Sequence, residues 1–100
     1  MNFLRSFPIQ RFKIKNSSMS PVLKAHEEVI TVSYFFSKPK VGDIIVFRHL
    51  VPPFIYCKKI KKIFQDKIWV EGVNKKESID SRNFGFIDRK NIIGKVIIKL

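Results

Sequence analysis

The sequence predicts an all-β fold, a compact coiled sheet or partly closed barrel made by a single domain. Apolar and polar residues alternate along much of the 100-residue chain, β-branched and aromatic types are frequent, and turn residues separate short segments. No segment has the apolar periodicity of a long helix. With 45% hydrophobic residues the chain can bury one modest core. We therefore expect one domain over residues 1–100, with residues 1–9 as a loosely ordered N-terminal arm.

Six segments are expected to form strands, because each combines alternating apolar residues with β-branched or aromatic types. They are residues 11–16, 28–33, 44–48, 54–64, 67–71 and 92–100. Turns or irregular loops separate them, at residues 18–21, 38–43, 52–53, 65–66 and 72–85. Ser20 precedes a proline, which restricts it to extended conformations and supports a turn at this point. Short strands between turns are typical of small barrels and coiled sheets.

The chain is strongly basic. Twenty Lys and Arg residues against eight Asp and Glu give a net charge of +12, which favours an anionic partner such as nucleic acid or lipid headgroups without identifying it. No apolar stretch approaches the ~18 residues of a spanning helix, and the first residues lack the apolar core of a signal peptide. The sequence thus predicts a soluble cytoplasmic protein and leaves peripheral contact with an anionic membrane open.

Cysteine and histidine usage argues against a metal centre. Cys57 is the only cysteine, so no intramolecular disulfide can form, and His26 and His49 lie too far apart in sequence for a zinc spacing. We expect no metal and no cofactor. Both histidines are expected to be surface or packing residues.

Lys58 stands out within the longest expected strand. Side chains alternate across a strand, so Lys58 shares a face with the apolar neighbours Tyr56 and Ile60. A desolvated lysine has a lowered pKa and can act as a base at neutral pH. The other interpretation is a solvated basic edge, because residues 58–62 include four lysines. Spacing alone leaves both open.

A cluster of serines follows the first expected strand. Ser17, Ser18 and Ser20 lie on a turn fixed by Pro21, where a nucleophile could be held exposed. Serine needs a base, and no arrangement of serine, histidine and aspartate is evident. A lysine remains as the candidate base. The alternative is an ordinary turn serine whose hydroxyl caps the backbone.

Four segments resemble, in order, the characteristic boxes of type I signal peptidases. The first resembles the S-M-x-P-T-L box around the nucleophile, the second a K-x-G-D-hydrophobic strand, the third the x-x-K-R-V/I segment with the general base, and the fourth the G-D-N…S-x-D-S-R-x-F/W-G box. They are residues 18–23, 38–47, 56–60, and 69–74 with 78–85. The sequence departs from these boxes at Val22, Lys59 and Val73. The resemblance implies an all-β catalytic domain of the signal peptidase type.

The resemblance implies that Ser18 attacks the scissile carbonyl and that Lys58 accepts its proton. Ser78 would hydrogen-bond the lysine amine and orient it, while Asp80 and Arg82 would pair to hold their loop in place. The implied function is a serine endopeptidase that removes an N-terminal leader or propeptide from a precursor protein. The short pattern without an evident anchor most resembles the maturation proteases of nickel-type superoxide dismutase, whose precursor is then the implied substrate.

The resemblance also implies an oxyanion hole and a substrate pocket. The backbone N–H of Ser18 would donate to the oxyanion, and the amide of Asn16 is a competent second donor. Met19, Val22 and Leu23 would line shallow pockets for small residues of an extended peptide, which would pair along an exposed strand edge. Met19 and Phe84 could equally be core residues, and Trp69 is expected to be in the core.

A second function fits the composition. A small basic β-barrel that binds single-stranded nucleic acid without catalysis combines positive charge with stacking aromatic rings. The candidate stacking residues are Phe12, Phe35, Phe36, Phe54 and Tyr56. Composition alone favours this alternative, whereas the order of the four boxes favours the peptidase.

Overall fold

A computed structural model describes residues 8–35, 37–49 and 54–100. Most of the expected N-terminal arm, Phe36 and the break at residues 52–53 lie outside this described part. Within it, strands dominate and every strand pairing is antiparallel. The strands are β1 (Ile9–Lys13), β2 (Glu28–Val32), β3 (Ile44–His49), β4 (Phe54–Phe64), β5 (Lys67–Glu71), β6 (Ile87–Asp88) and β7 (Ile92–Lys99). The predicted all-β fold is confirmed.

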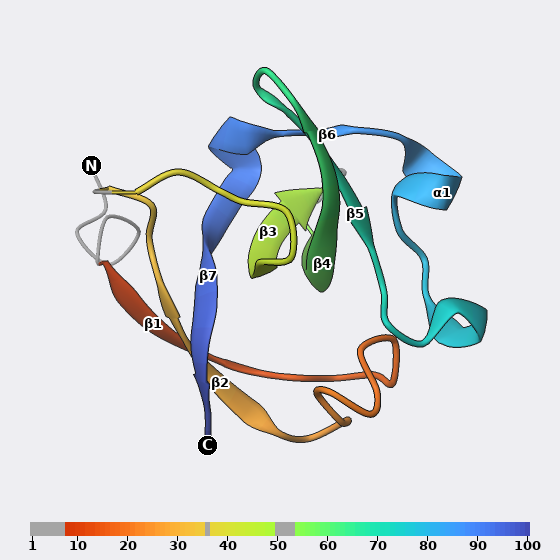
Figure 1. Cartoon of the computed structure of the whole chain (residues 1–100). Coiled ribbons are helices and arrows are strands. Elements are labelled where there is room, and N and C mark those ends of the chain that lie inside the picture. Colours follow the sequence, from red (N-terminus) through yellow and green to blue (C-terminus); the bar gives the residue numbers. More distant parts are fainter. Residues whose placement is uncertain (1–7, 36, 50–53) are drawn as a thin grey trace.

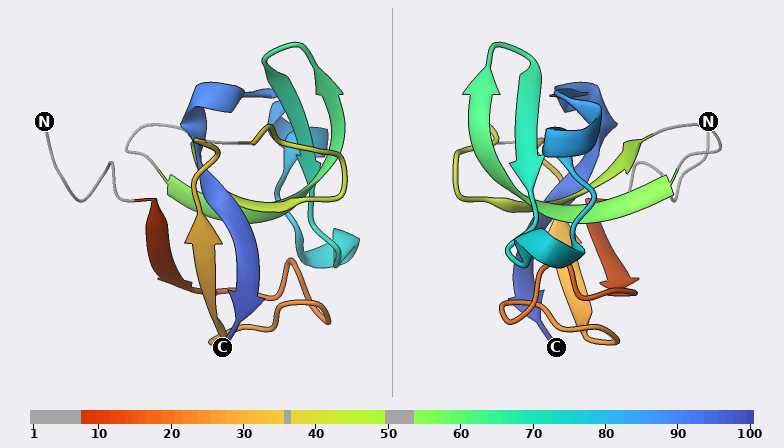
Figure 2. Two further views of the ribbon diagram at one scale, coloured as in Figure 1. Left: turned by 60° about the vertical axis from the view of Figure 1, so that its left-hand side comes forward. Right: turned by 90° about the vertical axis from the view of Figure 1, so that its right-hand side faces the viewer.

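The strands form one sheet that coils without closing into a barrel. Its order is β1-β2-β7-β3-β4-β5-β6. Figure 1 shows β1, β2 and β7 crossing at one side of the molecule, with β3, β4 and β5 beside them. The two turned views show the long β4 curving across the sheet before it turns into β5 (Figure 2). β7 joins the two halves because it pairs with both β2 and β3.

Two buried clusters form the core, one in each half of the coiled sheet. The larger consists of Ile45, Phe47, Ile60, Ile68, Val70 and Ile87. The smaller consists of Ile14, Met19, Leu23 and Val29, and it lies beneath the loop that follows β1. This loop is therefore anchored by its own apolar residues, which fixes the position of the serines it carries.

The structure differs from the expected elements at several points. β1 runs from Ile9 to Lys13, whereas residues 11–16 were expected. Beyond its end, Ile14 still forms backbone hydrogen bonds with Glu27 and His26 before the chain enters the loop. The expected loop over residues 72–85 contains two short helices, η2 (Lys75–Glu77) and α1 (Ser81–Phe84). β6 and the 3₁₀ turn η3 (Arg89–Asn91) were not expected.

Trp69 was expected in the core, but the structure does not place it there. It is partly buried, its indole N–H donates to Glu71 at 2.8 Å, and the ring of Phe86 packs edge-on at 5.0 Å.

His26 is exposed, whereas His49 packs against the ring of Phe84 at 4.2 Å. In the described part of the chain, no helix has the length and apolar character needed to cross a membrane.

Candidate active site

β4 carries Lys58 on the inner face of the sheet. Lys58 is only 2% exposed, and Ile60 on the same face is fully buried. Lys61 and Lys62 are exposed. The interpretation of residues 58–62 as a solvated basic edge therefore holds for Lys61 and Lys62. It is wrong for Lys58, whose amine is enclosed by the fold.

Ser18 meets Lys58 from the loop between β1 and β2. The loop is closed at its base by backbone hydrogen bonds from Ile14 N–H to Glu27 and from His26 N–H to Ile14, at 2.7 and 2.6 Å. Ser18 is 3% exposed, and the Lys58 amine donates a hydrogen bond of 2.6 Å to its Oγ. The two groups lie within the distance that a nucleophile and its base require.

The surroundings of Lys58 favour the neutral amine. Burial lowers the pKa of Lys58 from its ordinary value of 10.5, because the charged form loses its hydration. The negative charge of Asp80 opposes this change but does not cancel it. Burial also raises the pKa of the neighbouring Cys57 to about 12, so that thiol stays protonated and is a poor nucleophile. The pair of Ser18 and Lys58 therefore combines a hydroxyl with an amine whose pKa is lowered, as a general base requires.

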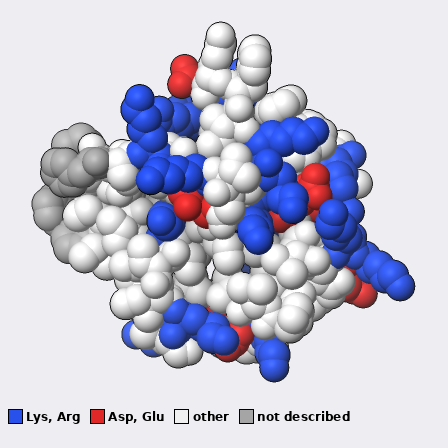
Figure 3. Space-filling model, in the orientation of Figure 1, with Lys and Arg blue, Asp and Glu red and all other residues white. Residues whose placement is uncertain are grey.

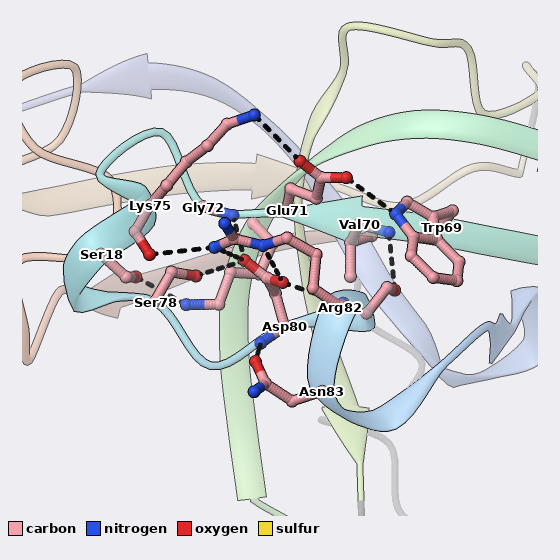
Figure 4. A network of polar contacts seen from close by, with 12 residues as sticks. Ser18, Trp69, Val70, Glu71, Gly72, Lys75, Ser78, Asp80, Arg82 and Asn83 are labelled. Carbon is pink, nitrogen blue, oxygen red and sulfur yellow. Dashed lines mark hydrogen bonds and ion pairs between the residues drawn. The ribbon is translucent and has the colours of Figure 1, made fainter.

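Asp80 is the centre of a buried polar network beside this pair (Figure 4). Its carboxylate accepts from Arg82 Nε and Nη2, both at 2.9 Å, from the Gly72 N–H at 2.8 Å and from the Ser78 hydroxyl at 2.6 Å. Burial raises the pKa of Asp80, but these hydrogen bonds lower it more, so the pKa lies below its ordinary value. The carboxylate is thus ionised, and it forms the ion pair with Arg82 that the resemblance implied.

A capping box explains why the chain folds into a helix at Asp80. The Asp80 side chain accepts from the Arg82 N–H, and the Asn83 side chain accepts from the Asp80 N–H at 3.1 Å. Ser81, the first residue of α1, is buried and its hydroxyl accepts from the Val70 N–H at 2.8 Å. These bonds fix α1 against β5 and hold the Asp80 carboxylate in place.

The hydrogen bonds of Ser78 and Lys58 differ from the expected contact between these two residues. Its hydroxyl donates to Asp80 Oδ2 at 2.6 Å, whereas the hydrogen bond of the Lys58 amine goes to Ser18. The ionised carboxylate is a strong acceptor for the Ser78 proton, so the Ser78 hydroxyl could meet the Lys58 amine only by accepting from it, and the amine donates to Ser18 instead. Figure 4 shows Ser78 lying between Ser18 and Asp80, so it remains a neighbour of the pair.

Gly72 and Asn74 support the backbone of Ser18, a role that the sequence interpretation did not assign. The Asn74 N–H donates to the Ser18 carbonyl at 2.7 Å. A Cβ on Gly72 would lie 2.3 Å from Ser78 Oγ and 2.7 Å from that carbonyl, so only glycine fits. The glycine within the fourth box was the available signal for this close approach.

Asn16 lies next to Ser18, with its side-chain oxygen facing the backbone. Asn16 Oδ1 accepts from the Ser18 N–H at 3.1 Å. This N–H is the expected oxyanion donor. In this structure Asn16 therefore satisfies that donor locally instead of presenting its own amide N–H beside it.

A groove with a volume of about 590 Å³ opens at Ser18 and Lys58, between β1 and the first half of β4. Of the expected pocket residues, Met19 lines it. Leu23 is 3% exposed within the smaller core cluster, and Val22 is 45% exposed outside the lining. Val22 and Leu23 do not line this groove, because the turn directs Leu23 into the core and Val22 into solvent.

Of the proposed stacking aromatics, the four that the structure describes do not all line the same cavity. Phe12, Phe54 and Tyr56 line the groove, but Phe47 stacks on the Tyr56 ring at 5.6 Å and covers one of its faces. Phe35 lines a different cavity. Within residues 8–35, 37–49 and 54–100, no group of three or more His, Cys, Asp and Glu residues could hold a metal ion.

Comparison with known proteins identifies similar sequences. The family described as signal peptidase, peptidase S26, matches residues 1–60 and 49–100. The chain is 24% identical over 143 aligned residues to signal peptidase I of Leptolyngbya laminosa, covering 96% of this chain and 70% of that one. It is 27% identical over 135 residues to the probable chloroplastic thylakoidal processing peptidase 2 of Arabidopsis thaliana, covering 86% and 36%.

A third similar protein is subunit 2 of the mitochondrial inner membrane protease of Saccharomyces cerevisiae. The identity is 30% over 113 residues, covering 85% of this chain and 64% of the yeast protein. The chain thus spans about a third to 70% of the length of the three proteins.

Proposed function

Since this chain belongs to the signal peptidase family, peptidase S26, we propose that it is a serine endopeptidase that removes an N-terminal leader from a precursor protein. The hydrogen bond of 2.6 Å between the buried Lys58 amine and the Ser18 hydroxyl carries the proposal. In it, Ser18 is the nucleophile and Lys58 the general base. Asp80, Arg82 and Ser78 are positioning residues that support the surrounding loop.

Acylation begins when the neutral Lys58 amine takes the proton from Ser18 Oγ as this oxygen attacks the scissile carbonyl carbon. The carbonyl electron pair moves onto oxygen. The resulting oxyanion accepts hydrogen bonds from the Ser18 N–H and from the side-chain N–H of Asn16, whose amide group rotates to present this donor. When the oxyanion collapses, the C–N bond breaks and the leaving amine takes the proton from the Lys58 ammonium. An ester on Ser18 remains.

Deacylation repeats these steps with water. Lys58 accepts a proton from a water molecule as the water oxygen attacks the ester carbonyl. Collapse of the second oxyanion releases the carboxylic acid product and returns the proton to Ser18 Oγ. The lowered pKa of Lys58 supports both half-reactions, because each starts from the neutral amine.

The substrate in this proposal is an extended strand lying in the groove. Among the residues that the structure describes, β1 pairs with β2 alone, so its other edge has no described partner strand. The first half of β4 pairs with β3, whereas its pairing with β5 starts at Lys59, so residues 54–58 also have an edge without a described partner strand. Backbone groups on these two edges can bind a peptide regardless of its side chains, while the groove determines which side chains fit.

For the identity of the precursor, the finer proposal is the N-terminal extension of a nickel-type superoxide dismutase precursor, which rests on the sequence resemblance. Peripheral contact with an anionic membrane rests on the charge of +12. Figure 3 shows Lys and Arg spread over several elements of one face, with acidic groups at few points, so charge on this face does not mark one narrow binding stripe.

The test incubates a candidate precursor with the purified chain and follows both products by mass spectrometry. We expect Ser18→Ala and Lys58→Met each to lower the cleavage rate by at least about 10³-fold. Lys59→Met is the matched control, because it removes the adjacent lysine from the opposite face. Cleavage by both site variants at the wild-type rate would contradict the proposal.

A further inference from the structure

The groove beside Ser18 has a one-sided charge that the proposed chemistry does not use. Arg11, Lys13 and Lys15 line its β1 side. Across the described ranges of the chain, no aspartate or glutamate lines this groove. The other lining residues are largely apolar, with Met19 and Val46 among them. The groove thus offers an apolar floor with cations along one wall.

Two of these cations, Lys13 and Lys15, form no ion pair within the described part of the chain. Arg11 donates to Glu28 at 2.6 Å, in a pair that occupies this carboxylate. Lys13 lies opposite Glu28 in the register and acts on it only through longer-range attraction. Lys13 and Lys15 are exposed, and neither forms an ion pair with any residue that the structure describes. Both charges are free to meet a ligand.

We propose that the groove selects extended peptides that carry an acidic side chain within about two to five residues of the scissile bond, an inference that rests on the proposed peptidase function. Lys13 is the last residue of β1, Lys15 lies in the loop between β1 and Ser18, and both line the groove that opens at Ser18. An extended peptide that lies in the groove from Ser18 along β1, rising ~3.3 Å per residue, passes both lysines within a few residues. The carboxylate pairs with a lysine while neighbouring apolar side chains contact the floor, which fixes the register of the peptide.

An acidic peptide fits this groove better than single-stranded nucleic acid does. Bases need exposed aromatic faces for stacking. Tyr56 packs against both Phe47 and Phe84, which leaves Phe12 and the exposed Phe54 as the other rings that line the groove. The two strand edges without a described partner strand offer backbone donors and acceptors that match a peptide. A phosphate backbone has no N–H donors with which to pair along them.

The experiment measures binding to the Ser18→Ala chain, so that it does not depend on turnover. Fluorescein-labelled decapeptides with small central residues are made in pairs that differ only by Glu or Gln at one position, and affinities are measured by anisotropy. We expect the Glu peptide to bind about two- to fivefold more tightly at positions on one side of the centre. Adding Lys13→Gln and Lys15→Gln together should remove the preference.

The matched control replaces Lys38 and Lys61 by Gln, because both are exposed and lie outside the groove lining. This variant loses the same net charge and should keep the preference for Glu. Equal affinities within every pair, no peptide binding, or equal loss of preference in the control would overturn the inference. Displacement of the Glu peptide by an equally charged oligothymidylate at the same concentration would assign the groove to nucleic acid instead.

Cleavage of the same peptides by the unsubstituted chain separates the inference from the proposed function. Cleavage without a difference between Glu and Gln overturns only the acidic preference. A preference for Glu in binding, without cleavage of any peptide or precursor, overturns the peptidase and leaves a binder of acidic peptides.

Discussion

Lys58 Nζ lies 2.6 Å from Ser18 Oγ, although the two residues are 40 positions apart in the sequence. Lys58 comes from the inner face of β4, and Ser18 comes from a loop held by its own apolar cluster. Two independently anchored elements therefore bring an amine and a hydroxyl together where both are almost fully buried. This preorganised contact distinguishes the site from an ordinary turn serine and an ordinary surface lysine.

The pH dependence of activity should follow the ionisation of Lys58. The amine acts only when neutral, and burial lowers its pKa, so kcat/KM should rise with pH along a limb whose midpoint lies below 10.5. A pH–rate profile on a cleaved precursor peptide measures this. Lys59→Met should retain the limb, and a midpoint at or above 10.5 would show that the amine is not desolvated.

The stability of the folded chain should show the same pKa. Between the lowered pKa of folded Lys58 and 10.5, the unfolded chain binds more protons than the folded one, so stability rises with pH in this window. Below the window the unfavourable contribution is constant. Lys58→Met should therefore be the more stable chain at neutral pH, and urea unfolding should show this advantage shrinking as the pH approaches 10.5.

Asp80→Asn should destabilise the protein by about 2–4 kcal/mol, because the buried carboxylate accepts hydrogen bonds from Arg82, Ser78 and the Gly72 N–H. Chemical denaturation measures the change. Asp88→Asn is the control, since Asp88 pairs with Lys67 at 3.3 Å where both side chains are exposed, and it should cost under ~1 kcal/mol. Equal losses in the free energy of unfolding would mean that the Asp80 network stabilises the protein no more than an exposed ion pair does.

Gly72→Ala should lower kcat by displacing the Ser18 backbone, because the new Cβ would lie 2.7 Å from the Ser18 carbonyl. Gly42→Ala is a useful comparison. Gly42 has a φ of 98° and open space around it, so this substitution should cost about 1 kcal/mol of stability and leave kcat unchanged. Steady-state kinetics of both variants separate the effects, and an unaltered kcat in Gly72→Ala would refute the proposed contact.

Asn16→Ala should lower kcat by about 10²- to 10³-fold with little change in KM, the effect of losing one oxyanion donor. The donor must first turn, because Asn16 Oδ1 accepts from the Ser18 N–H in this structure. Asn91→Ala, in η3 away from the groove lining, should leave both constants unchanged. If Asn16→Ala keeps its kcat, the backbone N–H of Ser18 stabilises the oxyanion without Asn16.

Most of the strands and the shared face of Tyr56, Lys58 and Ile60 could be predicted from the sequence, because both depend on a local alternation of side chains. The alternation left open whether this face is buried. β4 has the predicted bounds, and Tyr56, Lys58 and Ile60 share a face. α1 was missed because four residues are too few for a periodic pattern. The capping box of Asp80 and Asn83 was the only local signal for it.

The contacts that complete the site could not be predicted in this way. The choice of Ser78 between Lys58 and Asp80 depends on which acceptor the folded loop brings close and how strongly it accepts. Leu23 is buried in a core that residues distant in sequence also form. The spacing of residues in the sequence predicts neither the hydrogen-bond partner of Ser78 nor the burial of Leu23.

The most direct test of Ser18 as the nucleophile is to trap the ester. A peptide with an activated C-terminal ester is mixed with the chain and quenched in acid, and intact mass followed by peptide mapping locates the acyl group. The mass increase should map to Ser18, be absent in Ser18→Ala and fall to background in Lys58→Met. An acyl group on any other residue, or cleavage of the ester without Ser18, would contradict the account.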